Sequence, residues 1–404
     1  MSLIVQKFGG SSVASAECVF NVADIVTKTY AKGHSVVVVV SAQGDTTDDL
    51  IAKAKEINDV PSKREMDMLL TSGEQISASL LAMAIEKLGY PVVSLLGWQA
   101  GFMTSSAYGS ARIKRVIPDR IKKELDKKNI VIVTGFQGIN RYNDMTTLGR
   151  GGSDTSAVAI ASVMKADLCQ IYTDVEGVFT ADPRKVRNAR KLDYISYDEM
   201  LELATLGAQV LNNRSVEMAK KYGIQLEVLS SLTKKRGTIV KEATNVEKML
   251  ISGIAKDEDV ARVSIIGVPD RPGLAFKVFS KLSAKNINVD IILQSVGRNG
   301  TKDISFTVSQ DNLKETIDIL DPYVELIGAT SVVYDENVAK VSIVGAGMET
   351  HPGTAAEMFE ALYDANINIQ MIATSEIKIS VLIDRSDADK AVTTIHNKFF
   401  NDAM

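Results

Sequence analysis

The feature that most constrains the fold is a duplication in the last third of the chain. The segment VARVSIIG at Val260–Gly267 recurs as VAKVSIVG at Val338–Gly345, about 80 residues later. A Pro-Gly pair and an Asn-Ile-Asn triplet follow at matching distances in both copies. Each copy reads strand, Pro-Gly turn, helix, strand, strand, helix, as in a ferredoxin-like βαββαβ unit. The repeat therefore predicts two small successive domains, at residues 260–334 and 335–404.

Before the duplication, residues 1–243 alternate β-rich runs with helical patterns. Helices are predicted at Ala16–Lys32 and Ser153–Lys165. The predicted strands are rich in β-branched residues and lie at Leu3–Phe8, Val36–Ser41, Val92–Leu96, Ile130–Thr134 and Leu168–Thr173. This alternation predicts one layered α/β domain with a mainly parallel sheet. Residues 244–259 are expected to form a linker and an extra strand for either repeat.

Composition narrows the classes of function. The net charge is −4, without the basic excess that nucleic-acid binding needs, so we expect no nucleic-acid partner. The apolar run Ser35–Ala42 is far shorter than the roughly 20 residues of a membrane span, and we expect a cytoplasmic protein without a membrane partner. The two cysteines lie in apolar segments and the three histidines are far apart, which argues against a zinc site or a Ser–His–Asp triad.

The segment KFGGSS, at Lys7–Ser12, connects a predicted strand to a predicted helix. Glycines at such a turn let backbone N–H groups face a phosphate, and Lys7 adds a mobile positive charge. The pattern is not a Walker A loop, which requires GxxxxGK[ST]. A tight connection without any ligand would show the same glycines, so this motif leaves both interpretations open.

A second glycine-rich turn, GRGGSDTSA at Gly149–Ala157, opens a buried helix. Helix capping by Ser153 would explain the serine but not the flanking Arg150 and Asp154. A guanidinium binds a carboxylate through two parallel hydrogen bonds. Two glycine-rich helix starts in one domain therefore indicate two anionic ligands, a nucleotide and an acidic substrate.

Hydroxyl and carboxylate side chains mark two further segments. Ser41 and Thr47 follow the strand at Val36–Ser41, and ligands bind outside the carboxyl ends of such strands in open α/β sheets. Glu74, in TSGEQISA, is either a solvated surface residue or a ligand for an ammonium group.

The segment YTDVEGVFTADPR, at Tyr172–Arg184, follows a strand and is dense in turn residues. Thr173 and Asp174 can hydrogen-bond a base or ribose, and Arg184 can pair with phosphate. The alternative is an ordinary loop shaped by its glycine and proline.

In this order the five segments resemble the amino acid kinase family, and the duplicated tail resembles tandem ACT domains, which points to the aspartokinase branch. The resemblance implies that ATP and L-aspartate give ADP and 4-phospho-L-aspartate, the first step of the pathway to lysine, threonine and methionine. Mg²⁺ would be held mainly by phosphates. The resemblance implies that Lys7 and Asp154 are the catalytic residues. The implied ligands of ATP are Lys7, Phe8, Gly9, Gly10, Ser11, Thr173, Asp174, Phe179 and Arg184, and those of aspartate are Ser41, Thr47, Glu74, Arg150, Gly151, Gly152, Ser153 and Asp154.

The chain departs from the family pattern at two positions. Gln209 stands where relatives often carry a lysine beside the nucleotide, so a charged contact there is absent. Phe179 stands where many relatives carry tyrosine, which keeps a stacking face and loses a hydroxyl.

The chemistry follows from ordinary ionisation. An aspartate side chain, with a pKa near 3.9, is already a nucleophilic carboxylate at pH 7, so no general base is needed. Catalysis should rest on positioning and charge neutralisation, with Lys7 and the Gly9 and Gly10 amides facing the transferring phosphoryl.

The resemblance also assigns an effector site to the first repeat. Asp270, in VPDRPG, would take the ammonium of an inhibitory amino acid, lysine or threonine or both, and Gln294 would contact it too. The second copy has METHPG, without an acid at the equivalent place, so the copies are expected to differ in ligand. Alternatively, both units are scaffolds that join chains through sheet edges, and a homo-oligomer through the ACT units is expected.

Two other functions fit the same motifs. One is a different kinase of this family, acting on glutamate or a nucleoside monophosphate, and the other is a catalytically inactive amino-acid sensor. A separate regulatory chain starting at Met249 is also conceivable.

Overall fold

The computed structural model describes residues 2–207, 210–233, 235–243, 250–295, 297 and 300–400. Gln209, Met249 and the first part of the expected linker, residues 244–249, fall outside this range. The chain divides into two compact units. Unit 1 comprises Met1–Phe179 and Lys191–Val246, and unit 2 comprises Thr180–Arg190 and Glu247–Met404.

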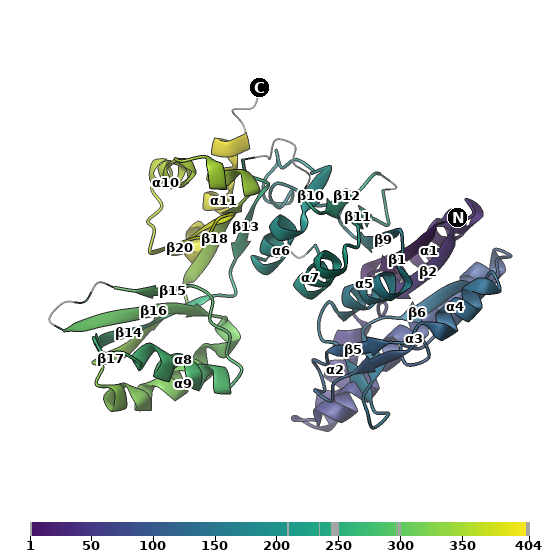
Figure 1. Cartoon of the computed structure of the whole chain (residues 1–404), viewed down its shortest axis with the longest axis horizontal. Coiled ribbons are helices and arrows are strands. Elements are labelled where there is room, and N and C mark those ends of the chain that lie inside the picture. Colours follow the sequence, from purple (N-terminus) through teal and green to yellow (C-terminus); the bar gives the residue numbers. More distant parts are fainter. Residues whose placement is uncertain are drawn as a thin grey trace. The chain divides into compact units, whose positions relative to one another are not determined.

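Unit 1 is built on an eight-stranded sheet (Figure 1). Its order is β10 (Tyr194–Ser196), β12 (Thr238–Lys241), β11 (Leu226–Ser230), β9 (Leu168–Thr173), β1 (Leu3–Phe8), β2 (Ser35–Val40), β6 (Ile130–Thr134) and β3 (Val92–Leu95). Neighbouring strands run parallel except for β11 beside β12. The predicted parallel α/β layer is confirmed, because the five predicted strands are β1, β2, β3, β6 and β9.

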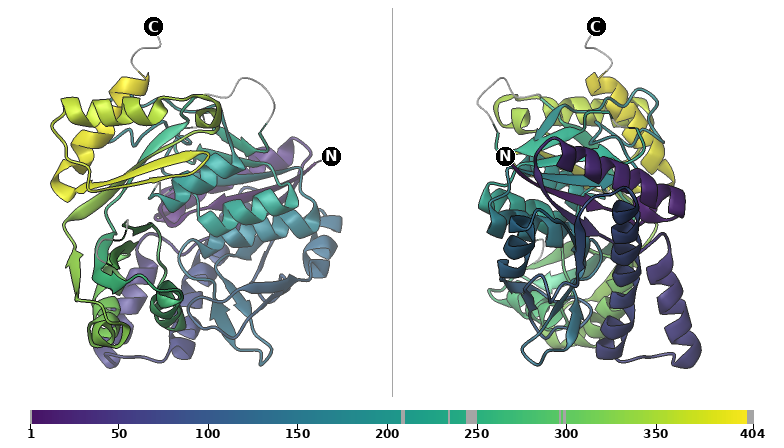
Figure 2. Two further views of the ribbon diagram at one scale, coloured as in Figure 1. Left: turned by 60° about the vertical axis from the view of Figure 1, so that its left-hand side comes forward. Right: turned by 90° about the vertical axis from the view of Figure 1, so that its right-hand side faces the viewer.

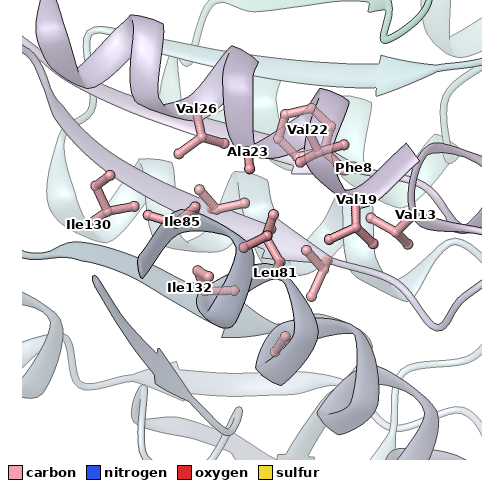
Figure 3. Packing of buried hydrophobic residues seen from close by; sticks show 14 of the residues in the cluster. Phe8, Val13, Val19, Val22, Ala23, Val26, Leu81, Ile85, Ile130 and Ile132 are labelled. Carbon is pink, nitrogen blue, oxygen red and sulfur yellow. The ribbon is translucent and has the colours of Figure 1, made fainter. Parts of the chain in front are cut away.

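Two helices cover one face of this sheet. Apolar side chains of α1 (Ala16–Ala31) and α3 (Lys63–Lys87) form one buried cluster with strands β1, β2 and β6 (Figure 3). Phe8, Leu81 and Ile132 in this cluster are fully buried, and such side chains each contribute about 1.5–3 kcal/mol to stability. Because side chains alternate along a strand, Phe8 faces α1 while its neighbour Lys7 faces α5 (Gly152–Met164), on the opposite side.

Helix α3 is, within the described residues, the one helix long and apolar enough to cross a membrane by length and composition. It carries the buried side chains Asp67 and Glu74 and packs Leu81 and Ile85 into the core beside the sheet. These contacts are those of a core helix.

The remaining elements of unit 1 are short. A four-stranded sheet, β5-β4-β7-β8, was not predicted, because its strands have only three or four residues. The bounds are β4 (Phe102–Thr104), β5 (Ile113–Val116), β7 (Gln137–Ile139), β8 (Met145–Thr147), η1 (Gly10–Val13), α2 (Thr46–Ile57), α4 (Asp119–Asp126), α6 (Tyr197–Thr205) and α7 (Asn213–Tyr222).

Unit 2 holds the two repeats, each with two helices packed on a four-stranded sheet (Figure 1, Figure 2). The first consists of β14 (Ala261–Pro269), α8 (Leu274–Ala284), β15 (Ile292–Gln294), β16 (Thr301–Val308), α9 (Gln310–Ile327) and β17 (Ser331–Asp335). The second consists of β18 (Val338–Val344), η2 (Ala346–Thr350), α10 (Thr354–Asp364), β19 (Met371–Thr374), β20 (Lys378–Asp384), η3 (Arg385–Asp387) and α11 (Ala388–Phe400).

The fourth strand of the second repeat's sheet comes from upstream of both repeats. Strand β13 (Gly253–Asp257) precedes the first repeat, yet it pairs antiparallel with β18 of the second. It takes the sheet position that β17 holds beside β14 in the first repeat. The sequence predicted an extra strand here without choosing a repeat.

The segment at 180–190 also belongs to the second repeat. Ala181 and Val186 lie in its core cluster, and the Thr180 hydroxyl lies 2.8 Å from Nε2 of the buried His396 on α11. The predicted nucleotide segment, Tyr172–Arg184, therefore runs from unit 1 into unit 2.

Candidate functional site

The centre of the candidate site is an ion pair between the two glycine-rich motifs. Lys7 Nζ lies 2.8 Å from Asp154 Oδ1, and each side chain is about nine-tenths buried. Lys7 comes from the carboxyl end of β1, and Asp154 from the first turn of α5. The fold thus brings together residues that the sequence had placed in separate motifs. Their pairing leaves a cationic nitrogen fixed beside the start of a helix, where anions are stabilised.

Gly151 is the N-cap of α5 and has a left-handed backbone, with φ +69°. No side chain caps this helix, and Ser153 lies inside it, so the capping interpretation of Ser153 is wrong. A Cβ at Gly151 would lie 2.3 Å from Asn212 Nδ2, so only glycine fits. The Gly152 N–H already donates to Gly149 O at 2.9 Å, so an anion at this helix start would face the amides that follow Gly152 in the first turn.

The first glycine-rich turn runs into the short helix η1. A Cβ on Gly10 would lie 2.8 Å from Ala42 O, so the turn packs closely against the end of β2. Gly9 N–H donates to Tyr172 O at 3.3 Å, so the expectation that this amide faces phosphate is wrong for the structure as it stands. The first amides of η1, at Gly10 and Ser11, have no acceptor within that helix. The Phe8 ring stacks on Tyr172 in the core, which leaves only its backbone for a ligand.

Glu74 is not a solvated surface residue. It is 3% exposed, and one carboxylate oxygen accepts a hydrogen bond from Ala42 N–H at 3.1 Å. The other oxygen, Oε2, is buried and has no hydrogen-bond partner among the described residues. Burial raises the pKa of Glu74 to about 7. A buried, half-satisfied carboxylate of this kind is suited to receive a cationic group.

Ser41 and Thr47 lie on the β2–α2 side of the site. Ser41 follows β2, and its N–H donates to the carbonyl oxygen of Phe8, the last residue of β1, at 3.1 Å. Thr47 lies in the first turn of α2. Both side chains are half-buried. Ser41 lies at the carboxyl end of β2, as the sequence predicted, and Thr47 lies in the helix that follows.

The nucleotide residues divide between the two units. Thr173 ends β9, Asp174 follows it, and the Thr173 hydroxyl accepts from Val175 N–H at 2.9 Å. Phe179 is half-buried and forms an isolated bridge with Lys191. Arg184 lies in unit 2, and its exposed guanidinium binds both carboxylate oxygens of Asp182. Arg184 is therefore not part of the unit that holds Lys7.

The predicted effector residues lie on the sheet of the first repeat. Asp270 follows β14, is 57% exposed and pairs with Lys302 at 2.8 Å. Gln294 ends the edge strand β15 and is exposed. Asp270 thus offers a carboxylate with one cationic neighbour, at the turn that opens α8.

Three residues that contact the site were missed from the sequence. Asp67 is fully buried and accepts hydrogen bonds from Gly109 N–H and from the backbone and hydroxyl of Thr147. At the start of α7, Asn212 donates to the carbonyl oxygen of Arg150 in the Gly149–Gly152 turn, and Arg214 donates to that of Leu148, just before the turn. The Asn-Asn-Arg-Ser run before α7 was a helix-start signal that could have pointed to them.

Comparison with family models gives three matches. The model described as "Amino acid kinase family" matches residues 2–230, which is more than half of the chain. Two ACT domain models match residues 262–323 and 341–399. The matches cover most of unit 1 and both repeats.

The chain is similar to proteins named aspartokinases. It is 50% identical over 405 residues to the "Aspartokinase" of Mycolicibacterium smegmatis, which covers 99% of this chain and 96% of that protein. A crystal structure of aspartate kinase from Synechocystis is 42% identical, with a TM-score of 0.56, and covers 98% of this chain and 69% of that one. E. coli aspartokinase III, crystallised with lysine and aspartate in the T-state, is 25% identical, with a TM-score of 0.75 and coverage of 98% and 99%.

Proposed function

The chain belongs to the amino acid kinase family, in its aspartokinase branch, and we propose that unit 1 transfers the γ-phosphoryl of ATP to the side-chain carboxylate of L-aspartate. It is an ATP-dependent kinase with two ACT domains. The observation that carries the proposed site is the buried Lys7–Asp154 pair, which places one cation between two glycine-rich turns.

Lys7 and Asp154 have different tasks in this proposal. The nucleophile is a carboxylate that is ionised at pH 7, so Asp154 does not act as a base. Asp154 instead holds Lys7 Nζ at 2.8 Å and fixes where the positive charge lies. Lys7 then neutralises the repulsion between the incoming carboxylate and the triphosphate, an effect that grows as charge shifts in the transition state. The Gly10 and Ser11 amides donate to the same phosphoryl oxygens.

Aspartate is bound by groups of opposite charge. The guanidinium of Arg150 binds a carboxylate of aspartate through two parallel hydrogen bonds, and Oε2 of Glu74 binds the ammonium group of aspartate. Ser41, Thr47 and Ser153 supply hydroxyls, and Gly151 and Gly152, which have no side chains, let the substrate approach the backbone at the start of α5.

ATP enters with Mg²⁺ on its phosphates. No group of three or more His, Cys, Asp or Glu side chains able to hold a metal occurs among the described residues, and Asp154 is already paired with Lys7. The nucleotide therefore supplies most of the ligands of the ion, which screens the phosphate charge when bound. Thr173, Asp174 and Phe179 are proposed to contact the base and ribose, whereas Arg184 belongs to unit 2, pairs there with Asp182 and is left out of the proposed site.

Unit 2 is proposed to sense an inhibitory amino acid, lysine or threonine or both, at Asp270 and Gln294 of the first ACT domain. An effector can lower activity only by favouring one arrangement of the enzyme over another. We also propose a homo-oligomer through the ACT domains, because edge strands β15 and β19 expose apolar residues such as Ile292 and Ile372. A cytoplasmic location fits the use of ATP and a free amino acid.

Trapping the product with hydroxylamine tests the proposal. An acyl phosphate reacts to a hydroxamate, so ATP with aspartate should give equal amounts of ADP and aspartyl hydroxamate. Glutamate, N-acetylglutamate and nucleoside monophosphates should give neither ADP nor hydroxamate above background. Turnover with one of those acceptors alone would assign the chain to a different member of the family, and binding of amino acids without any turnover would leave a sensor.

A further inference from the structure

Arg214 joins two backbone segments beside the aspartate site. It lies in the first turn of α7, half-buried, with Nη1 donating to Leu148 O at 2.7 Å and Nη2 donating to Ala111 O at 3.2 Å. Leu148 comes directly before the Gly149–Gly152 turn that carries Arg150. The guanidinium of Arg214 therefore holds Leu148, which precedes the turn, to the segment that contains Ala111.

Asn212, the N-cap of α7, holds the other end of the same turn. Its Nδ2 donates to Arg150 O at 3.1 Å, and its backbone N–H donates to Asp154 Oδ2 at 3.3 Å. Its Oδ1 accepts from Arg214 N–H at 3.0 Å, so the two residues act as one connected group. The start of α7 thus holds the turn at residues 148, 150 and 154.

The turn needs external support because of its own composition. Gly149 and Gly151 have positive φ values of 83° and 69°, and glycines have no side chains with which to pack. Asp67 joins Thr147, before the turn, to Gly109 with hydrogen bonds of 2.7–3.0 Å. Arg214 likewise joins Leu148 to Ala111 through their carbonyl oxygens.

We propose that Arg214 is a positioning residue for aspartate binding: it holds the backbone of the 148–151 turn so that Arg150 is directed at the substrate carboxylate. The inference rests on the proposed function, because it assumes that Arg150 binds aspartate. A lysine at this position cannot reproduce this arrangement, since its three donors sit on one nitrogen and not on the two separate nitrogens of a planar fork. Asp154 is held by the backbone N–H of Asn212 and not by the Arg214 guanidinium, so replacing the Arg214 side chain should affect the chemical step less than substrate affinity.

The test compares Arg214→Lys and Arg214→Ala with wild type. Arg120→Ala is the matched control, because Arg120 is an exposed arginine on α4 that pairs with Glu124 of the same helix. The aspartate KM should rise about tenfold or more in both Arg214 variants, since small displacements at a binding site cost up to about a hundredfold. The ATP KM and kcat should stay within about threefold of wild type. Arg120→Ala should match wild type.

Chemical rescue separates positioning from general loss of structure. Guanidinium or ethylguanidinium at millimolar concentration should lower the aspartate KM of Arg214→Ala, and should not affect Arg120→Ala. The Arg214→Lys variant, which keeps the charge and most of the side chain, provides the comparison if the alanine variant does not fold.

Two results would overturn the inference. One is an unchanged aspartate KM in either folded Arg214 variant. The other is an equal loss in kcat and both KM values, with a lowered melting temperature and no rescue, which would make Arg214 a purely structural residue. Failure of the wild-type enzyme itself to phosphorylate aspartate would instead refute the proposed function, so the two failures are distinguishable.

Discussion

Protonation of Glu74 should control how tightly the enzyme binds aspartate near neutral pH. Burial raises the pKa of Glu74 to about 7, and its Oε2 lacks a hydrogen-bond partner among the described residues. The ammonium group needs the ionised carboxylate, and a bound cation lowers the pKa of an adjacent acid. Aspartate therefore selects the ionised form of Glu74, and its apparent affinity falls as pH falls through 7.

The size of the effect follows from the ionised fraction. With a pKa of about 7, Glu74 is roughly 90% ionised at pH 8 and roughly 10% ionised at pH 6. Apparent affinity scales with the fraction of competent protein, so the aspartate Kd should be about tenfold weaker at pH 6, or about 1.4 kcal/mol. The reacting carboxylate of aspartate, with a pKa near 3.9, stays ionised throughout.

Calorimetric titration of nucleotide-free enzyme with aspartate measures this linkage without titrating phosphates. At pH 7, in buffers of different ionisation enthalpy, binding should release about half a proton per site. The Glu74→Gln variant keeps the shape of the side chain, so it should bind weakly with little pH dependence between 6 and 8. An equally steep pH dependence in Glu74→Gln, or no proton release in wild type, would refute the assignment.

Two further changes test the other sites. Arg150→Lys keeps the positive charge but loses the planar pair of donors, so the aspartate KM should rise about tenfold while the ATP KM stays unchanged. Steady-state kinetics measure both values. An unchanged aspartate KM would show that Arg150 is not part of the substrate site. Asp270→Ala removes the proposed ammonium ligand of the effector, so lysine and threonine, alone and together, should no longer inhibit while uninhibited kcat is kept. Inhibition retained at wild-type effector concentrations would place the effector elsewhere.

Local patterns were enough to predict the main layer of unit 1. The run Val36–Val40 is buried on both faces, and such continuous β-branched runs occur where helices cover both sides of a sheet. The strand at Ile130–Thr134 was predicted on the same grounds. By contrast, the strands at Phe102–Thr104 and Gln137–Ile139 are three residues long and show no measurable periodicity. Their pairing depends on contacts distant in sequence, which local propensity does not encode.

The site was predictable as a set of motifs but not as a geometry. Lys7 and Asp154 each stood in a glycine-rich turn, and only the packing of α5 on β1 showed that they form one ion pair. Arg214 was missed because its partners are carbonyl oxygens, which any residue can supply; the Asn-Asn-Arg-Ser run marks the start of a helix but does not identify these partners. The pairing of β13 with the second repeat was left open for a similar reason, since backbone pairing between distant strands leaves a weak trace in sequence.

The central claim is that Lys7, held by Asp154, supplies the charge that lets a carboxylate attack ATP. The most direct test is the single-turnover rate of ADP formation in Lys7→Ala and wild type, with aspartate and MgATP both saturating. The account predicts a rate at least about a hundredfold lower, with the aspartate Kd within about threefold of wild type. A single-turnover rate within a few-fold of wild type would contradict it.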